Sequence, residues 1–257
     1  MKDYKLGIQI HSVREAFAED PAATLKRVRE IGYTGVELTI NQCAGRPAEF
    51  FRQALKDADL ECYGMLTSWS DVQDDKIDET IAYNNAMGSG FLVIGSVPKK
   101  LVSTESDAMA AIAKMNDIYN RLSAQGIVTG YHNHDSDHTN IVGGKSFFEH
   151  VFDNTPEGFV MLLDTGNALA GGCESIPALK KYPNRSPYLH IKGYSEEKGY
   201  LAYIGQDDFD WPAVIRCALD VGGAKVFDIE FGKRADYDPF ERAADSYRVV
   251  SSILADM

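Results

Sequence analysis

Short apolar runs alternate with longer amphipathic runs along the whole 257-residue chain. A compact apolar run between polar loops indicates a buried strand, whereas apolar residues that recur every three to four positions indicate a helix. Runs of the first kind predict strands at residues 6–10, 36–39, 61–66, 91–94, 127–131, 159–163, 188–191 and 225–231. Runs of the second kind predict helices at residues 21–31, 47–58, 76–87, 105–125, 145–152, 176–181 and 212–221, with a last helix that opens at residues 238–241.

Capping residues support the ends of these helices. Asp20 precedes Pro21 at the start of the first predicted helix, and Gly32 follows its end. Asp238 and Pro239 repeat the same start at the last helix. An N-cap aspartate accepts a hydrogen bond from the first turn, proline suits the first helical position, and glycine ends a helix.

Strands that are always separated by helices predict parallel pairing with right-handed crossovers. Eight such units with no linker and no spare strand favour a closed barrel over an open, doubly wound sheet. The open sheet would require a phosphate-binding glycine motif, and neither GxGxxG nor GxxxxGK[ST] occurs in the sequence. We therefore expect an α/β protein, a single (β/α)8 TIM barrel over residues 1–257. The longest loops, 135–144 and 193–210, are predicted to cover its active site.

Composition excludes several kinds of partner. Hydrophobic residues make up 44% of the chain and charged residues 25%, which is typical of a folded domain. A net charge of -12 argues against nucleic acid, because phosphate binding requires clustered Lys and Arg. No run of 18 apolar residues occurs, so no membrane partner is expected. Four scattered cysteines without a CxxC pair, and no signal-peptide core, favour a cytoplasmic protein. The sequence leaves a monomer and a homo-oligomer both open.

Polar residues gather where the predicted strands end, which is where a barrel carries its active site. Four of the six histidines lie at such ends: His11, His132, His134 and His190. Asp164, Lys192 and Glu230 lie at the ends of the sixth, seventh and eighth strands. Because residues two apart share one face of a strand, His190 can point the same way as Lys192.

Asp164, His190 and Glu230 end three consecutive strands and can meet above the barrel core. His132 from the preceding strand adds a fourth donor. A mixed imidazole and carboxylate set suits Mn, Zn, Co or Fe, and Mg less readily. Buried carboxylates are costly without a partner, and a metal ion compensates for them. The sequence therefore predicts one divalent metal ion held by these four residues.

Several short motifs, each weak alone, occur in a specific order. They are Gly7-Ile8-Gln9 with Arg14, Gly35-Val36-Glu37-Leu38, Tyr131-His132-Asn133-His134-Asp135, Leu163-Asp164-Thr165-Gly166-Asn167, Leu189-His190-Ile191-Lys192, Phe209-Asp210-Trp211, Ile229-Glu230 and Asp238-Pro239-Phe240-Glu241. Together they resemble the xylose isomerase-like barrel superfamily, in its sugar phosphate isomerase/epimerase branch, which includes inosose dehydratase. The resemblance implies one ion, with Mn favoured and Mg, Co or Zn as alternatives, on Asp164, His190 and Glu230. The fourth family ligand is usually a glutamate, where this chain has His132, so His132 either takes that ligand's place or does not bind the ion.

A metal-stabilised enediolate is the intermediate that this ligand set and the resemblance favour, formed from a small-molecule sugar substrate. Return of the proton to a different carbon would isomerise the sugar. Return to the opposite face of the same carbon would epimerise it. Since His132 replaces the family's second glutamate, a keto-sugar dehydratase or lyase on the same site is the alternative. A metal-dependent hydrolase and a non-catalytic sugar-binding barrel form a third class; a nuclease would require more histidines and a basic face.

The remaining site residues receive roles within this scheme. Glu230 or His134 would move the proton, and Lys192 would polarise the carbonyl, bind a phosphate or hydroxyl, or pair with Asp228 or Glu230. Asp135 or Asp137 could supply a second base instead. Substrate-binding roles are expected for four further residues, namely His11, Glu37, Trp69 and Asp135. An ion pair with Arg14 is the alternative for Glu37. Trp211 could form a sugar-stacking face with Trp69, and core packing is the alternative for Trp211.

Overall fold

Eight parallel strands close into a barrel in the computed structural model, which describes residues 4–232 and 237–257. In chain order they are β1 (Lys5–Gln9), β2 (Gly35–Thr39), β3 (Glu61–Thr67), β4 (Phe91–Ile94), β5 (Val128–His132), β8 (Val160–Asp164), β9 (Tyr188–Ile191) and β10 (Val226–Ile229). The pairing order β1-β10-β9-β8-β5-β4-β3-β2 closes on itself. The predicted (β/α)8 TIM barrel is therefore confirmed.

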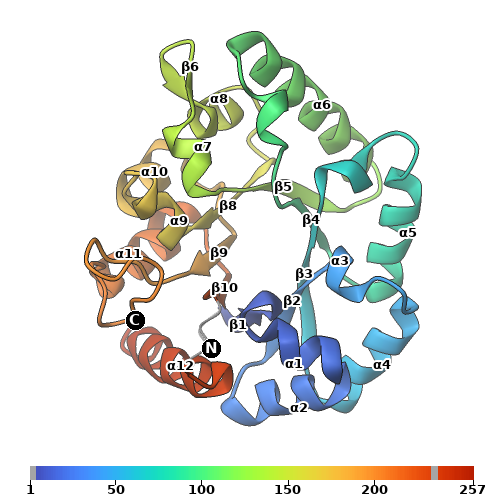
Figure 1. Ribbon diagram of the computed structural model, residues 1–257, viewed down its shortest axis with the longest axis vertical. Coiled ribbons are helices and arrows are strands. Elements are labelled where there is room, and N and C mark those ends of the chain that lie inside the picture. The colour runs from blue at the N-terminus through green and yellow to red at the C-terminus, as the bar shows by residue number, and fades with distance from the viewer. Residues whose placement is uncertain (1–3, 233–236) are drawn as a thin grey trace.

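A ring of helices surrounds the barrel (Figure 1). Its members are α2 (Pro21–Ile31), α4 (Ala48–Asp57), α5 (Ile77–Met87), α6 (Glu105–Ser123), α8 (Phe147–Asp153), α10 (Ser175–Lys181), α11 (Trp211–Cys217) and α12 (Pro239–Ala255). Each lies where the sequence predicts a helix, with ends shifted by a few residues. In the part of the chain that the structure describes, no helix combines the length and the apolarity needed to cross a membrane.

The predicted capping residues act at both ends of the chain. Asp20 accepts a hydrogen bond from the backbone N–H of Ala23 at 3.0 Å, and Asp238 accepts one from Phe240 at 2.8 Å. Gly32 ends α2 with φ 123°, a left-handed angle that only glycine adopts without strain. These contacts explain why α2 and α12 begin where the sequence predicts.

Helix α8 begins two residues later than predicted because Ser146 caps it. The Ser146 hydroxyl accepts from the backbone N–H of Glu149 at 3.2 Å, and the Glu149 carboxylate accepts from the Ser146 backbone in return at 3.2 Å. Residues Lys145–Ser146 form β7, which pairs with β6 (Ile141–Val142) in a short antiparallel hairpin.

Short elements that the sequence did not predict lie mainly after barrel strands. They are α1 (Arg14–Glu19), α3 (Ile40–Cys43), α7 (Asp135–Thr139), α9 (Thr165–Ala170) and the 3-10 turns η1 (Ile10–Val13), η2 (Trp69–Val72) and η3 (Lys99–Leu101). One or two turns are too short to show an apolar repeat. The helix predicted at 212–221 ends as a π turn, η4 (Ala218–Gly222), which continues α11. The loop 193–210 contains only an isolated bridge between Ser195 and Gly199.

The face of the strands that points into the barrel changes from apolar to polar along the strand direction. Apolar and aromatic side chains pack together, mostly toward the amino ends of the strands, namely Tyr63, Leu66, Val93, Val160, Leu162, Tyr188 and Val226. Two residues farther along these strands, the alternation brings Asp164, His190 and Asp228 to the same face. The barrel thus places its polar groups toward the carboxyl ends of its strands.

Candidate metal centre

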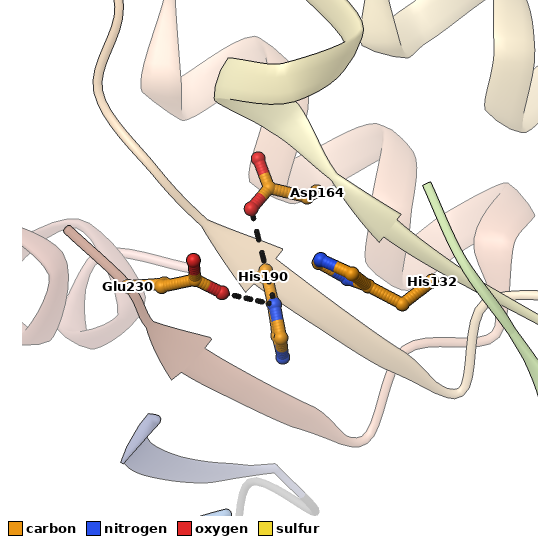
Figure 2. Close-up of side chains that lie close together, drawn as sticks. All are labelled: His132, Asp164, His190 and Glu230. Atoms are coloured by element: carbon orange, nitrogen blue, oxygen red, sulfur yellow. Dashed lines mark ion pairs between the residues drawn. The ribbon is translucent and has the colours of Figure 1, made fainter. Parts of the chain in front are cut away.

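Four side chains from four neighbouring strands converge at the carboxyl end of the barrel (Figure 2). His132 ends β5, Asp164 ends β8, His190 lies in β9, and Glu230 directly follows β10. One nitrogen or oxygen atom from each lies within 4.8 Å of the others, and all four side chains are buried. The structure therefore brings together the four residues that the sequence predicts as metal ligands.

Several donor atoms of this group lack hydrogen-bond partners. Nδ1 of His190 lies 2.9 Å from Oε2 of Glu230 and 3.9 Å from Oδ2 of Asp164. The His132 ring centroid is 4.8 Å from that of His190. Among the described residues, Asp164 Oδ2, His132 Nδ1 and His190 Nδ1 are buried without a hydrogen-bond partner. Such atoms are rare in folded proteins, and a divalent ion between them would satisfy all of them, so the residues fit the predicted metal.

Asp164 is held by the turn that follows β8. Its Oδ1 accepts from the backbone N–H of Asn167 at 2.7 Å, which makes Asp164 the N-cap of α9. The backbone N–H of Asp164 donates to the side-chain Oδ1 of Asn133 at 2.7 Å. The side-chain amide of Asn167 donates to the backbone carbonyl of Asn133 at 3.0 Å. This network leaves Oδ2 facing the centre. Both asparagines belong to the sequence motifs, but the sequence did not predict this positioning role.

Lys192 lies against the two carboxylates. Its ammonium is 2.9 Å from Oε1 of Glu230 and 3.3 Å from Oδ2 of Asp164, and it donates to Oδ1 of Asn167 at 3.1 Å. The pairing with Glu230 is one of those that the sequence allowed. The ammonium also lies 5.2 Å from the ring centroid of Tyr200, in the loop 193–210. No pattern around Tyr200 in the sequence indicated that it would reach the site.

Burial and neighbouring charges set the protonation of these groups. Burial raises the pKa of Asp164 to about 6, against the opposing effect of Lys192. Burial also acts to raise the pKa of Glu230, but Lys192 and His190 hold it well below its usual value. Burial and the adjacent His190 lower the pKa of His132 far below its usual value. A charged Glu230 and a neutral His132 are the forms in which these side chains bind metal.

Three other predicted residues lie around this centre. His134 is half-buried at the N-cap of α7, with its ring centroid 4.9 Å from that of His132. Asp135 begins α7 and is exposed, and His11 is exposed in η1, which follows β1. All three lie at the carboxyl ends of barrel strands, where a substrate would enter.

Glu37 and Trp69 lie deeper than the sequence suggested. Glu37 is fully buried inside the barrel, and its Oε2 lies 3.0 Å from Nε2 of His190. Arg14, its expected alternative partner, donates to the carbonyl of His11 at 2.9 Å. Trp69 is 9% exposed and belongs to the hydrophobic core. The substrate-binding roles of Glu37 and Trp69 remain predictions.

Asp137 gives the protein a pH dependence that can be tested separately. Its buried carboxylate accepts from the hydroxyl of Tyr131 at 3.1 Å and from the backbone of His134 at 2.7 Å. Burial outweighs these bonds and raises its pKa to about 6. Because the folded protein then binds this proton more tightly than the unfolded chain, Asp137 contributes most stability at low pH and loses it as pH rises through about 6.

We expect Asp137→Asn to remove this contribution. Between pH 4.5 and 7 the wild type should lose about 2 kcal/mol more of its free energy of unfolding than the variant does. Urea unfolding of both proteins at the two pH values measures the difference. Equal pH dependence in the two proteins would show that Asp137 titrates in the folded state as it does in the unfolded one.

The protein is a closed (β/α)8 barrel with a buried group of two imidazoles and two carboxylates at its mouth. It therefore falls in the class of barrels with a candidate divalent metal centre. The chain belongs to the xylose isomerase-like TIM barrel family, whose sequence model matches residues 25–252. This confirms the resemblance drawn from the motifs. The sequence matches no curated protein.

Solved structures share the fold over almost the whole chain. A sugar phosphate isomerase/epimerase from Parabacteroides distasonis has a TM-score of 0.82 at 20% identity, covering 98% of this chain and 96% of that one. D-allulose 3-epimerase from Methylomonas sp. has a TM-score of 0.69 at 13% identity, covering 98% of both chains. The IOLI protein, described with a bound zinc atom, has a TM-score of 0.73 at 11% identity, again covering 98% of both. At these identities the likeness is one of fold.

Proposed function

We propose that the protein is a divalent-metal-dependent isomerase or epimerase of a small sugar, sugar phosphate or keto-sugar. The observation that carries the proposal is the buried group His132, Asp164, His190 and Glu230, whose ligand atoms lie within 4.8 Å of one another. Structures with the same fold include proteins described as a sugar phosphate isomerase/epimerase and a D-allulose 3-epimerase, which supports this class of substrate.

The ligand set suits one ion. Two imidazoles and two carboxylates favour Mn, with Co, Zn and Mg as alternatives, and IOLI is described with zinc. When bound, the ion would polarise a substrate carbonyl and stabilise the negative charge that develops as the neighbouring carbon loses its proton. The burial of the four ligands would strengthen this stabilisation.

Glu230 is the group that we assign to take the proton. Its carboxylate remains charged beside Lys192 and His190, and its two oxygens face different partners. His134 follows β5 and lies next to His132, with ring centroids 4.9 Å apart, and is our second candidate for moving a proton. Lys192 lies beside Glu230 and can donate a hydrogen bond to a substrate oxygen. We therefore assign Glu230 and His134 as the two candidate proton-transfer groups.

A keto-sugar dehydratase or lyase is the second candidate. The observation that favours it is His132, which occupies the position where the family usually carries a second glutamate. Epimerisation by two glutamates requires one carboxylate on each face of the substrate. A single carboxylate is enough to remove a proton, and loss of a β-hydroxyl would then complete the elimination. The same centre would serve, with Lys192 available to assist the leaving hydroxyl.

We also propose that residues 1–257 act as one barrel domain in the cytoplasm. Cys43, Cys62, Cys173 and Cys217 are all free thiols, which supports a reducing compartment.

Proton exchange with solvent tests the proposed reaction. The metal-loaded protein is incubated in D2O with a panel of aldoses, ketoses, their phosphates and keto-inositols, and each sugar is followed by proton NMR. We expect deuterium at the carbon next to the carbonyl of at least one sugar, with a new isomer or epimer. An enone absorbance in place of an isomer identifies the lyase. Absence of exchange in every sugar, with metal bound, contradicts both candidates.

A further inference from the structure

A second group of acidic side chains lies inside the barrel, below the metal centre. Glu37 of β2 and Asp228 of β10 are both fully buried, and each has an oxygen within 4.8 Å of the other and of a nitrogen of His190. Tyr188 donates its hydroxyl hydrogen bond to Oδ2 of Asp228. The proposed proton transfer uses neither carboxylate, so their burial requires another explanation.

The two nitrogens of His190 face opposite groups. Nδ1 points to the centre, 2.9 Å from Oε2 of Glu230, whereas Nε2 lies 3.0 Å from Oε2 of Glu37. A neutral imidazole has one N–H donor and one lone pair, and the partner of one nitrogen determines which form is present. A carboxylate at Nε2 favours the proton on that nitrogen and leaves the lone pair of Nδ1 for a metal ion.

From these contacts we infer that Glu37 is a positioning residue that fixes the ring and the tautomer of His190 for metal binding. The inference rests on the proposed metal centre and extends it to a strand that contributes none of the four ligands. Metal-binding histidines generally donate their second N–H to an acceptor of this kind, and loss of the acceptor weakens metal binding about 10–100-fold.

The barrel is shaped to hold this group together. A Cβ atom at position 7 would lie 2.0 Å from Oδ1 of Asp228, so Gly7 leaves the space that Asp228 occupies. Asp228 lies on β10 and Glu37 on β2, the two strands that pair with β1, and their carboxylates lie within 4.8 Å of each other inside the barrel. A rival explanation is a second metal ion on Glu37, His190 and Asp228, and the stoichiometry of binding distinguishes it from the positioning role.

The test is the binding of Mn²⁺ and Zn²⁺ to the apoprotein by isothermal titration calorimetry. We expect one ion per chain in the wild type and a Kd about 10-fold or more higher in Glu37→Gln. In wild-type protein labelled with ¹⁵N-histidine and loaded with Zn²⁺, we expect the proton of His190 on Nε2. This second readout requires no variant to fold.

Glu149→Gln is the matched control. It makes the same chemical change in the capping box of α8, where Glu149 pairs with Lys181 outside the barrel. It should lower thermal stability without changing the metal Kd. An unchanged Kd in Glu37→Gln, the His190 proton on Nδ1, or two ions per chain would each overturn the positioning role. Absence of metal binding in the wild type would instead reject the proposed function.

Discussion

Replacement of Glu230 by glutamine is expected to reduce kcat by about 10²–10⁴-fold while the barrel stays folded. The amide has nearly the shape of the carboxylate but cannot accept a proton from carbon. It also removes the charge that contacts Lys192 at 2.9 Å and His190 at 2.9 Å. The measurement is steady-state turnover of the sugar identified by deuterium exchange, at saturating metal, together with circular dichroism.

Two controls make this result specific. Glu61→Gln changes an exposed carboxylate that pairs with Lys5 at the amino end of β3, and it should leave kcat unchanged. Metal titration of Glu230→Gln separates lost proton transfer from lost metal. A metal-saturated variant with near-wild-type kcat would show that another group removes the proton, and His134 would then be the first candidate.

Removal of the metal is expected to abolish turnover and to lower thermal stability. Without an ion, buried carboxylates and unpartnered nitrogens remain at the mouth of the barrel. A ligand that binds only the folded state at 100 times its Kd stabilises it by about 2.7 kcal/mol. For a protein of this size that corresponds to a rise in Tm of about 5–10 °C. Activity and Tm after chelation, and after return of each divalent ion, provide the measurement.

Asp164→Asn is the control for this prediction. The amide can still cap α9 through its oxygen, but it removes the charge at Oδ2, which faces the centre. We expect this variant to gain little Tm and little activity from added metal. Full activity in chelated wild-type protein would exclude the ion from the reaction, and a metal-dependent Tm in Asp164→Asn equal to that of the wild type would place the ion elsewhere.

The barrel can be predicted from the sequence because the pattern that specifies each strand or helix lies within a short stretch of the chain. Each strand is a compact apolar run, and caps such as Asp20 and Asp238 act on their own helices. The ligand residues are predictable for the same reason, since His132 and Asp164 end their strands and the barrel brings strand ends together. Short helices such as α9 cannot be predicted in this way because they contain too few residues to show a helical repeat of apolar positions.

Contacts across the barrel are not predictable in the same way. Glu37 and His190 come from β2 and β9, and their contact depends on barrel closure and on a register shift between Val36 and Glu37 where β2 pairs with β3. Alternation predicts that Asp228 points inward with Glu230, but not which residue it faces. Tyr200 reaches Lys192 from an irregular loop, where no periodic pattern exists.

The proposed function requires that His132, Asp164, His190 and Glu230 hold one divalent ion at the mouth of the barrel. An anomalous difference map from crystals of the Mn-loaded protein tests it most directly. We expect one strong peak per chain, within about 2.0–2.3 Å of a donor atom from each of the four side chains. A map without a peak among these residues, or with its peak on another part of the protein, would contradict it.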